Sequence, residues 1–181
     1  MNSTEVRNLA VLALKDNTDA EERVYSPRDW STRSDLFPLI LIQTHSEDKK
    51  GIDKNAPKFN TTTTLRITAR IEEFDGESNE DGAMNAEVKL EELQEQIEKS
   101  LINSYELTRR IQRYSSVSSR IDVDSSGEGH IGQLLMLVSV EYFQGPDDFY
   151  PVVSDELKEV DISLAMPDGT TRPQVQIKFE G

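Results

Sequence analysis

No cysteine occurs in the chain. Disulfide bonds, thiolate metal sites and cysteine nucleophiles are therefore excluded, and the compartment is left open, with the cytosol the most compatible. Long apolar runs are missing too, since the longest, Leu134 to Val138, is far shorter than the roughly 20 residues of a membrane-spanning helix. The N-terminus has neither the basic nor the apolar block of a signal peptide. We therefore expect a soluble, intracellular protein.

Basic side chains are scarce: 20 lysines and arginines stand against 34 acidic residues, which gives a net charge of −14. A protein that reads nucleic-acid sequence needs a basic face to replace the counterions of the phosphates, so this balance argues against that class. It also argues against docking on anionic membranes. The hydrophobic share is only 35%, below the usual share, so part of the chain is expected to be solvated loop.

Two stretches place apolar residues on one face at helical spacing. The first begins at Ser3, a candidate N-cap, and stops near Asn17. The second is the main helix, and one or two further turns are expected between Glu106 and Tyr114. The two apolar stripes are Val6, Leu9, Ala10, Ala13 and Leu14 in the first helix, and Ala86, Leu90, Leu93, Ile97 and Leu101 in the main helix.

Four segments have the patterns of β-strands. Residues 37–43 are almost continuously apolar, as in a buried strand. Residues 61–72 and 117–123 alternate with a period of two, which predicts one buried and one polar face. Residues 131–143 have the strongest pattern and are expected to form the central strand. The apolar faces carry Leu65, Ile67, Ala69 and Ile71 in the second strand, and Leu134, Met136, Val138, Val140 and Tyr142 in the last.

Polar segments separate these strands. Residues 18–35 show no periodicity and predict an irregular segment. Residues 44–60 and 73–82 are rich in charged and turn-forming side chains, so both are predicted to be long exposed loops.

The last residues form a separate pattern. Residues 160–166 and 174–179 resemble strands, and Pro167-Asp168-Gly169 between them is a strong turn signal. The sequence therefore predicts an α+β domain over residues 1–150 and a C-terminal β-hairpin extension over residues 151–181. The domain is expected to contain a small, mostly antiparallel sheet, with the main helix packed on one face and the N-terminal helix beside it.

Catalytic chemistry has little support in the sequence. The two histidines, His45 and His130, are far apart in the chain. They could be combined with Asp122 and Asp124 into a metal or hydrolase site, but no metal-ligand spacing such as HExxH accompanies them. Two solvent-facing loop histidines are the simpler interpretation. Phosphate-binding glycine loops and a GxSxG nucleophile motif are also missing, so we expect no catalytic residue, no metal and no cofactor.

The segment from Asp122 to Gly127 matches the opening of a calcium-binding loop. The match fails at position twelve, where Gln133 stands in place of a bidentate glutamate. Asp, Ser and Gly are also the residues that a turn between two strands requires. We therefore predict a strand connection that binds no calcium.

Five residues are candidates for a subunit or partner interface. Tyr25, Trp30 and Phe59 are aromatic residues in polar surroundings, outside any periodic core pattern. Arg66 and Arg70 lie on the polar face of the strand 61–72, in an otherwise acidic protein, and could meet an acidic neighbour. The alternative for the two arginines is an ordinary solvated sheet face.

The order of these segments resembles that of tail terminator (minor tail, U-like) proteins of long-tailed bacteriophages and prophages, over about residues 5–150. It is a resemblance of order and pattern. The segments that carry it are the N-terminal helix, Val24-Tyr25-Ser26-Pro27, the strand Phe37 to Ile42, Thr64 to Ile67, the helix with Leu90, Leu93 and Ile97, Ile121-Asp122, the turn Gly127 to Gly132, and Val140-Glu141-Tyr142.

This resemblance implies an α+β protein that assembles with itself into a ring, usually a hexamer. The ring would cap the finished tail tube, stop its polymerisation and present a surface to a head-completion or neck protein, with DNA passing through. No enzymatic activity and no cofactor are implied. The protein would occur in the host cytoplasm during assembly and then in the virion tail. The loops 44–60 and 73–82 and the hairpin 156–181 depart from a minimal member.

Two other classes of function remain open. One is a small metal-dependent enzyme that uses His45, His130, Asp122 and Asp124. The other is a soluble adaptor that binds a peptide at a sheet edge.

Overall fold

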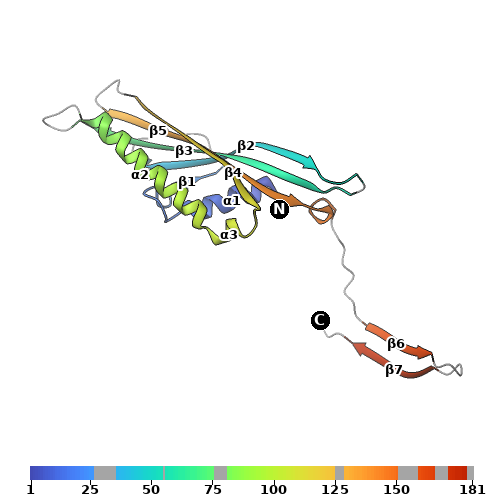
Figure 1. The fold of residues 1–181 in the computed structure, drawn as a ribbon. Coiled ribbons are helices and arrows are strands. Elements are labelled where there is room, and N and C mark those ends of the chain that lie inside the picture. The colour runs from blue at the N-terminus through green and yellow to red at the C-terminus, as the bar shows by residue number, and fades with distance from the viewer. Residues whose placement is uncertain are drawn as a thin grey trace. The chain divides into compact units, whose positions relative to one another are not determined.

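The chain divides into two compact units, Met1–Phe149 and Tyr150–Gly181. The first is an α+β domain in which helices cover one face of a sheet (Figure 1). The computed structural model describes residues 1–26, 36–54, 56–75, 81–124 and 129–150, and the backbone of residues 159–165 and 171–178.

The first unit is built around a five-stranded mixed sheet with the strand order β1-β2-β3-β5-β4. β1 pairs with β2 in parallel, and every other neighbouring pair is antiparallel. The mostly antiparallel sheet expected from the sequence is therefore present. The strands are β1 (Val24–Tyr25), β2 (Leu39–Gly51), β3 (Phe59–Phe74), β4 (Arg113–Asp124) and β5 (Gly129–Gln144).

The helices lie together on one face of this sheet (Figure 1). They are α1 (Ser3–Leu14), the main helix α2 (Gly82–Asn103) and the short α3 (Tyr105–Thr108), and a 3-10 turn, η2, covers Pro146–Asp148. None of the helices that the structure describes is both long and apolar enough to cross a membrane.

The N-cap of α1 is Asn2, so the prediction of Ser3 was wrong by one residue. The Asn2 side chain accepts a hydrogen bond from the Glu5 N–H, and the Glu5 carboxylate accepts one from the Asn2 N–H. This reciprocal arrangement satisfies two backbone donors at the helix start. Asparagine and serine are similarly good caps, so propensity alone does not distinguish them.

The core lies between the helices and the sheet, and the predicted apolar stripes form it. All five stripe residues of α2 are at most 2% exposed, and they pack with the predicted apolar faces of β3 and β5. In α1, Leu9 is only partly buried, whereas the other four stripe residues belong to the core. The α2 residues are Ala86, Leu90, Leu93, Ile97 and Leu101.

The segment 44–60 is mostly strand, so its prediction as a long loop was wrong. β2 continues to Gly51 and β3 begins at Phe59, and the two remain paired to the Gly51–Phe59 position. The β2 part of this segment carries polar and charged residues without any apolar face, and its last residues are largely exposed. Its backbone groups are nevertheless paired, and that pairing needs no apolar side chain.

The strand expected to be central, β5, lies between β3 and β4, and β3 is the middle strand. Apolar content reports how much of a strand is covered on both faces, and it does not specify the order of neighbours. β3 also extends to Phe74, so only part of the predicted loop 73–82 remains, and residues 76–80 lie outside the described residues. β4 begins at Arg113, where further helical turns were expected.

The second unit contains β6 (Glu159–Ala165) and β7 (Thr171–Lys178), which pair in antiparallel fashion. They form a separate two-stranded sheet. The predicted turn residues between them lie outside the described part of the chain.

Candidate interaction surface

The sheet has one face that points away from the helices, which we call the outer face. Leu65, Ile67, Ala69 and Ile71 of β3 enter the core. Because side chains alternate along a strand, Arg66 and Arg70 point to the opposite side. The outer face of β3 comprises Thr64, Arg66, Thr68, Arg70 and Glu72.

The outer face is not an ordinary wet surface. Thr68, between the two arginines, is only 6% exposed, and Arg66 and Arg70 are half-buried. Apolar residues of the neighbouring strands stand opposite them, since Leu41 pairs with Thr68 and Leu137 with Arg66. The arginine stems are thus packed against the sheet, and their guanidinium groups form hydrogen bonds at its surface.

Arg66 has an unusual partner for a cation. Its Nη2 donates a hydrogen bond to Nδ1 of His45 at 2.9 Å. A guanidinium only donates, so Nδ1 of His45 must present its lone pair. Within the residues that the structure describes, the buried Nε of Arg66 has no acceptor and Arg66 forms no ion pair with a carboxylate. Within the described part of the chain, its positive charge is therefore not neutralised by a carboxylate.

Arg70 lies four residues after Arg66 on the same face of β3, with Thr68 between them. Its Nε donates to Oε1 of Gln133 at 3.0 Å, across the β3–β5 pair. Burial lowers the pKa of the Arg70 guanidinium. A fixed hydrogen bond and partial burial hold this side chain in one orientation, which favours a contact that depends on geometry.

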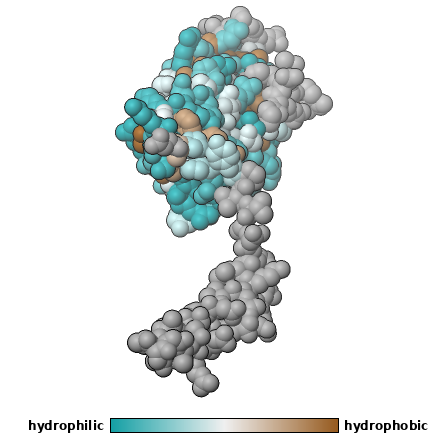
Figure 2. Space-filling view, turned by 90° about the vertical axis from the view of Figure 1, so that its right-hand side faces the viewer, coloured by the Kyte–Doolittle hydropathy of each residue, from teal (hydrophilic) through white to brown (hydrophobic). Residues whose placement is uncertain are grey.

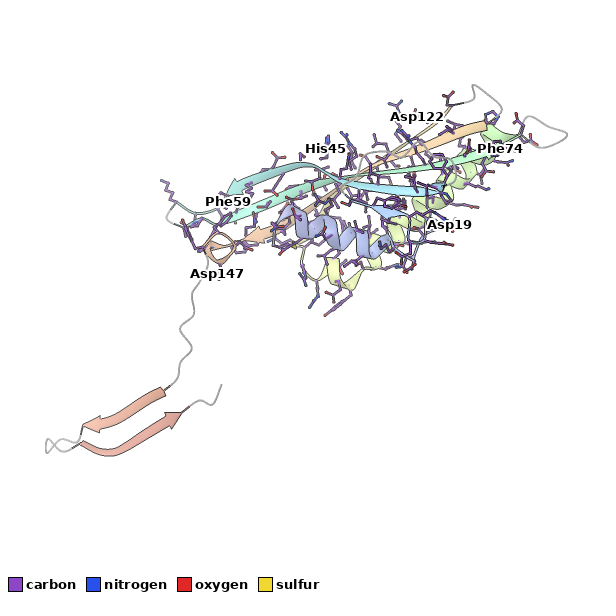
Figure 3. All side chains as sticks on the ribbon, turned by 180° about the vertical axis from the view of Figure 1, so that it is seen from behind. Asp19, His45, Phe59, Phe74, Asp122 and Asp147 are labelled. Carbon is purple, nitrogen blue, oxygen red and sulfur yellow. The ribbon has the colours of Figure 1, made fainter. Side chains whose placement is uncertain are left out.

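β4 contributes a charged pair to the same face. Nη2 of Arg120 donates to Oδ1 of Asp122 at 2.8 Å, and this bond raises the pKa of the Arg120 guanidinium. Figure 3 shows His45 and Asp122 on the side of the sheet away from the helices. The outer face therefore carries both signs of charge on β4 and mainly positive charge on β3.

The aromatic candidates lie elsewhere. Tyr25 is in β1 and Phe59 is the first residue of β3, so their placement in loops was wrong, and Trp30 lies outside the described residues. The Phe59 ring packs edge-on against Phe149, with ring centres 5.5 Å apart. Figure 3 shows Phe59 and Phe74 at opposite ends of the sheet. Phe59 is thus a local anchor, and its role in an interface stays a prediction.

The histidines are in strands, so their prediction as loop residues was wrong. His45 of β2 is exposed, but His130 of β5 is only 7% exposed. Nε2 of His130 lies 2.9 Å from Oδ1 of Asp75, and this oxygen also accepts the Gly82 N–H at the start of α2. The buried Nδ1 of His130 has no partner among the described residues.

The four residues of the possible metal enzyme are not gathered into one site. His45 follows Thr44, which pairs with Leu65 of β3, and Leu65 pairs with Val138 of β5. His45 is therefore level with about Val138, eight residues along β5 from His130. His130 is therefore about 26 Å away along the sheet, at roughly 3.3 Å per residue. Asp122 lies on the outer face, whereas His130 points toward the helices. Among the described residues, no cluster of three or more acidic or histidine side chains could hold a metal ion.

The predicted turn after Asp124 includes residues 125–128, which lie outside the described residues. Asp122, the first residue of the calcium-loop match, is in β4 and is paired with Arg120. The prediction that this segment binds no calcium stays untested.

A hollow with a volume of about 630 Å³ lies among the helices. Leu9 and Leu12 of α1 line it together with residues of α2 and α3, and none of the candidate residues does. The surface nearest the tip of the β2–β3 hairpin is mainly hydrophilic, with apolar residues scattered over it (Figure 2).

Comparison with known proteins adds no family to this picture. The chain matches no protein-family model, and a search of curated proteins finds no match either.

Proposed function

We propose that the chain is a structural assembly protein of the phage tail terminator type, which forms a ring, caps the tail tube and presents the surface that joins the head. The observation that supports a self-assembling protein best is Arg66. A half-buried cation that has no carboxylate partner among the described residues, on a chain with a net charge of −14, is suited to an acidic surface outside its own subunit.

The chain itself offers such an acidic surface. Glu87, Glu91 and Glu92 are exposed on α2 and form no ion pair among the described residues. They lie on the helix side of the domain, whereas Arg66 and Arg70 lie on the outer face. A contact between these opposite faces joins different surfaces of successive copies, and such heterologous contacts close into rings when the rotation permits.

The net charge opposes this association in dilute buffer of low ionic strength. The ring is therefore expected at high protein concentration, at raised salt or on a tail tube. A monomer in dilute, low-salt buffer is compatible with the proposal.

The test is to image tail assembly with and without the protein, and to measure its mass under native conditions at raised salt. We expect tubes of uniform length capped by a ring of about six subunits when the protein is present, and overlong tubes when it is omitted. Tails of normal, uniform length without the protein would refute the terminator function. A monomer that never joins a tail would refute the whole assembly class.

One observation favours a second candidate, a peptide-binding adaptor. β4 is the last strand of the sheet, and most of its residues are exposed, so an extended peptide could add to it. A monomer that binds an extended peptide of another protein with micromolar affinity would favour this function over ring assembly.

A further inference from the structure

The edge of the sheet at β4 is unusually open. β4 ends the five-stranded sheet, is 12 residues long and has mainly exposed side chains. A free edge presents unpaired N–H and C=O groups, and monomeric proteins normally protect it with proline, lysine or a very short strand. β4 contains neither proline nor lysine, and its register shift, between Tyr114 and Ser116, lies near its first residues and leaves the segment around Ile121 regular. By contrast, β1 at the other edge is only two residues long.

Large apolar side chains gather beside this edge. Val117 of β4 is 43% exposed, and it lines a small hollow with Ile102 of α2, which is 54% exposed. Met84 is 18 residues before Ile102, which is five helical turns, so it lies on the same flank of α2. It is 59% exposed. An exposed apolar flank along an open strand edge is typical of a surface that another chain covers.

We infer that β4 pairs with β4 of a second copy of this chain, antiparallel and centred on Ile121, so that the two sheets become one. In this register Arg120 stands opposite Asp122 of the second copy, and the reverse pair forms by symmetry. Each arginine then lies between two aspartates, its own and that of the second copy. Opposite charges directly across an antiparallel pair are favourable.

Other registers of this pairing are less favourable. Residues directly opposite each other point to the same face, so the pairing must be centred on a residue. Centring on Arg120 or on Asp122 sets like charges opposite each other, which is destabilising. Centring on Ser119 places Arg120 opposite Ser118 and leaves the charges uncompensated. Every register centred on a residue keeps the half-buried apolar residues Ile121 and Val123 on the helix side of the joint, so the charges of Arg120 and Asp122 decide between these registers.

This contact goes beyond the proposed function. It needs neither a tail tube nor the arginines of β3, and it is isologous, because the same strand serves both copies. It would join two subunits, or two rings, edge to edge. The ring contact proposed above joins opposite faces, so the two contacts do not compete for Arg66 or for the glutamates of α2.

The absence of cysteine allows a direct test by disulfide cross-linking of the full chain. In the proposed register, Ile121→Cys faces itself, with Cα atoms about 4.5–5.5 Å apart, which suits a disulfide. Ser119→Cys faces Val123 of the second copy, and the two copies of Cys at position 119 would be about 13 Å apart. Each variant is oxidised alone, and Ser119→Cys is also oxidised in a mixture with Val123→Cys.

We expect cross-linked dimer from Ile121→Cys and from the mixture, but little from Ser119→Cys alone. Exchange of the charges, Arg120→Asp with Asp122→Arg, should preserve the cross-link, whereas Arg120→Asp alone should reduce its yield several-fold. Equal yields from Ile121→Cys and Ser119→Cys would overturn the register. Absence of any cross-link at the concentration where ultracentrifugation detects a dimer would overturn pairing through β4. Arg66→Glu should leave the yield of the cross-link unchanged, because β4 does not contain Arg66. Failure of the ring contact would therefore leave the cross-link intact, whereas failure of the β4 contact would abolish it.

Discussion

Tyr114 is the residue whose ionisation is most clearly coupled to the fold. Its hydroxyl donates a hydrogen bond to the Leu101 carbonyl at 2.7 Å, at the end of the core stripe of α2. Burial raises the pKa of the Tyr114 hydroxyl to about 12. A tyrosine in an unfolded chain has a pKa of about 10. The folded state therefore favours the protonated hydroxyl. The resulting contribution to the free energy of unfolding is fully present below about pH 10.

The contribution should be lost as the pH rises from about 10 towards about 12, because the unfolded chain then releases the proton first. Ultraviolet difference titration of the wild-type protein against Tyr114→Phe isolates this tyrosine from the other four. We expect the difference signal to appear near pH 12 and the variant to lose less stability above pH 10. A midpoint near 10 would show that the hydroxyl is solvated.

His130 links three elements at the start of α2. Its ring contacts Asp75, which follows β3, and Asp75 also accepts the first helical N–H at Gly82. A Cβ at Gly82 would fall on the His130 ring, so only glycine fits at this position without displacing the histidine. The N-cap residue Asp81 makes no capping hydrogen bond with its side chain, and Asp75 accepts the Gly82 N–H at the helix start instead. The contacts of His130 and Asp75 therefore both pack and cap the first turn of α2. These contacts explain the burial of His130 by a structural role, and no catalytic or metal-binding role is needed to account for it.

At the scale of elements, the apolar stripe of α2 forms one side of the core, and it makes a direct prediction. Replacement of Leu93 or Ile97 by Ala should lower the free energy of unfolding by roughly 2–5 kcal/mol, because both are at most 1% exposed. Val88→Ala is the matched control on the same helix, since Val88 is 47% exposed, and its effect should stay within about 0.5 kcal/mol. Urea unfolding measures all three variants. Equal, small effects would contradict the packing of α2 on the sheet.

The elements that could be predicted from the sequence are those whose signal is local. The stripe of α2 and the alternation of β3 and β5 report burial directly, because one face of each meets the core. The β2–β3 hairpin beyond Thr44 gives no such signal. Its strands are stabilised by backbone pairing and by contacts such as Thr61 with Gln144, a hydrogen bond of 2.7 Å between residues far apart in the chain.

The same limit applies to the interaction surface. Arg66 and Arg70 could be placed on the polar face of a strand from alternation alone. Their partners His45 and Gln133 could not be found, because cross-strand neighbours depend on the register of β2 and β5 against β3. The register is set by the whole sheet. That Arg66 has no carboxylate partner among the described residues became apparent only with its neighbours in place.

For the whole molecule, the decisive feature is the opposition of two charged faces. Arg66 and Arg70 lie on the outer face, and Glu91 and Glu92 are exposed on α2 across the domain. If successive copies meet through these faces, Arg66→Glu should weaken self-association at least about tenfold per contact, because like charges are then opposed. Glu91→Arg together with Glu92→Arg should weaken it similarly.

Combination of the two sets of changes in one chain restores opposite charges between position 66 and positions 91 and 92, while Arg70 is unchanged, so association should recover in part. Lys15→Glu provides the control, since it reverses a charge at a surface ion pair with Glu22 and leaves Arg66 and the glutamates of α2 unchanged. Native mass measurement and sedimentation at moderate salt report the oligomer, and the urea midpoint shows that each variant is folded. Lys15→Glu and Arg66→Glu change the net charge equally, so a difference between them reports the position of the charge. Net charge alone does not explain recovery in the combined variant, because Glu91→Arg with Glu92→Arg makes the chain less acidic still and is nevertheless expected to associate more weakly. If the combined variant associates no better than Arg66→Glu, the two faces do not meet. The cation of Arg66 must then serve a partner other than this chain.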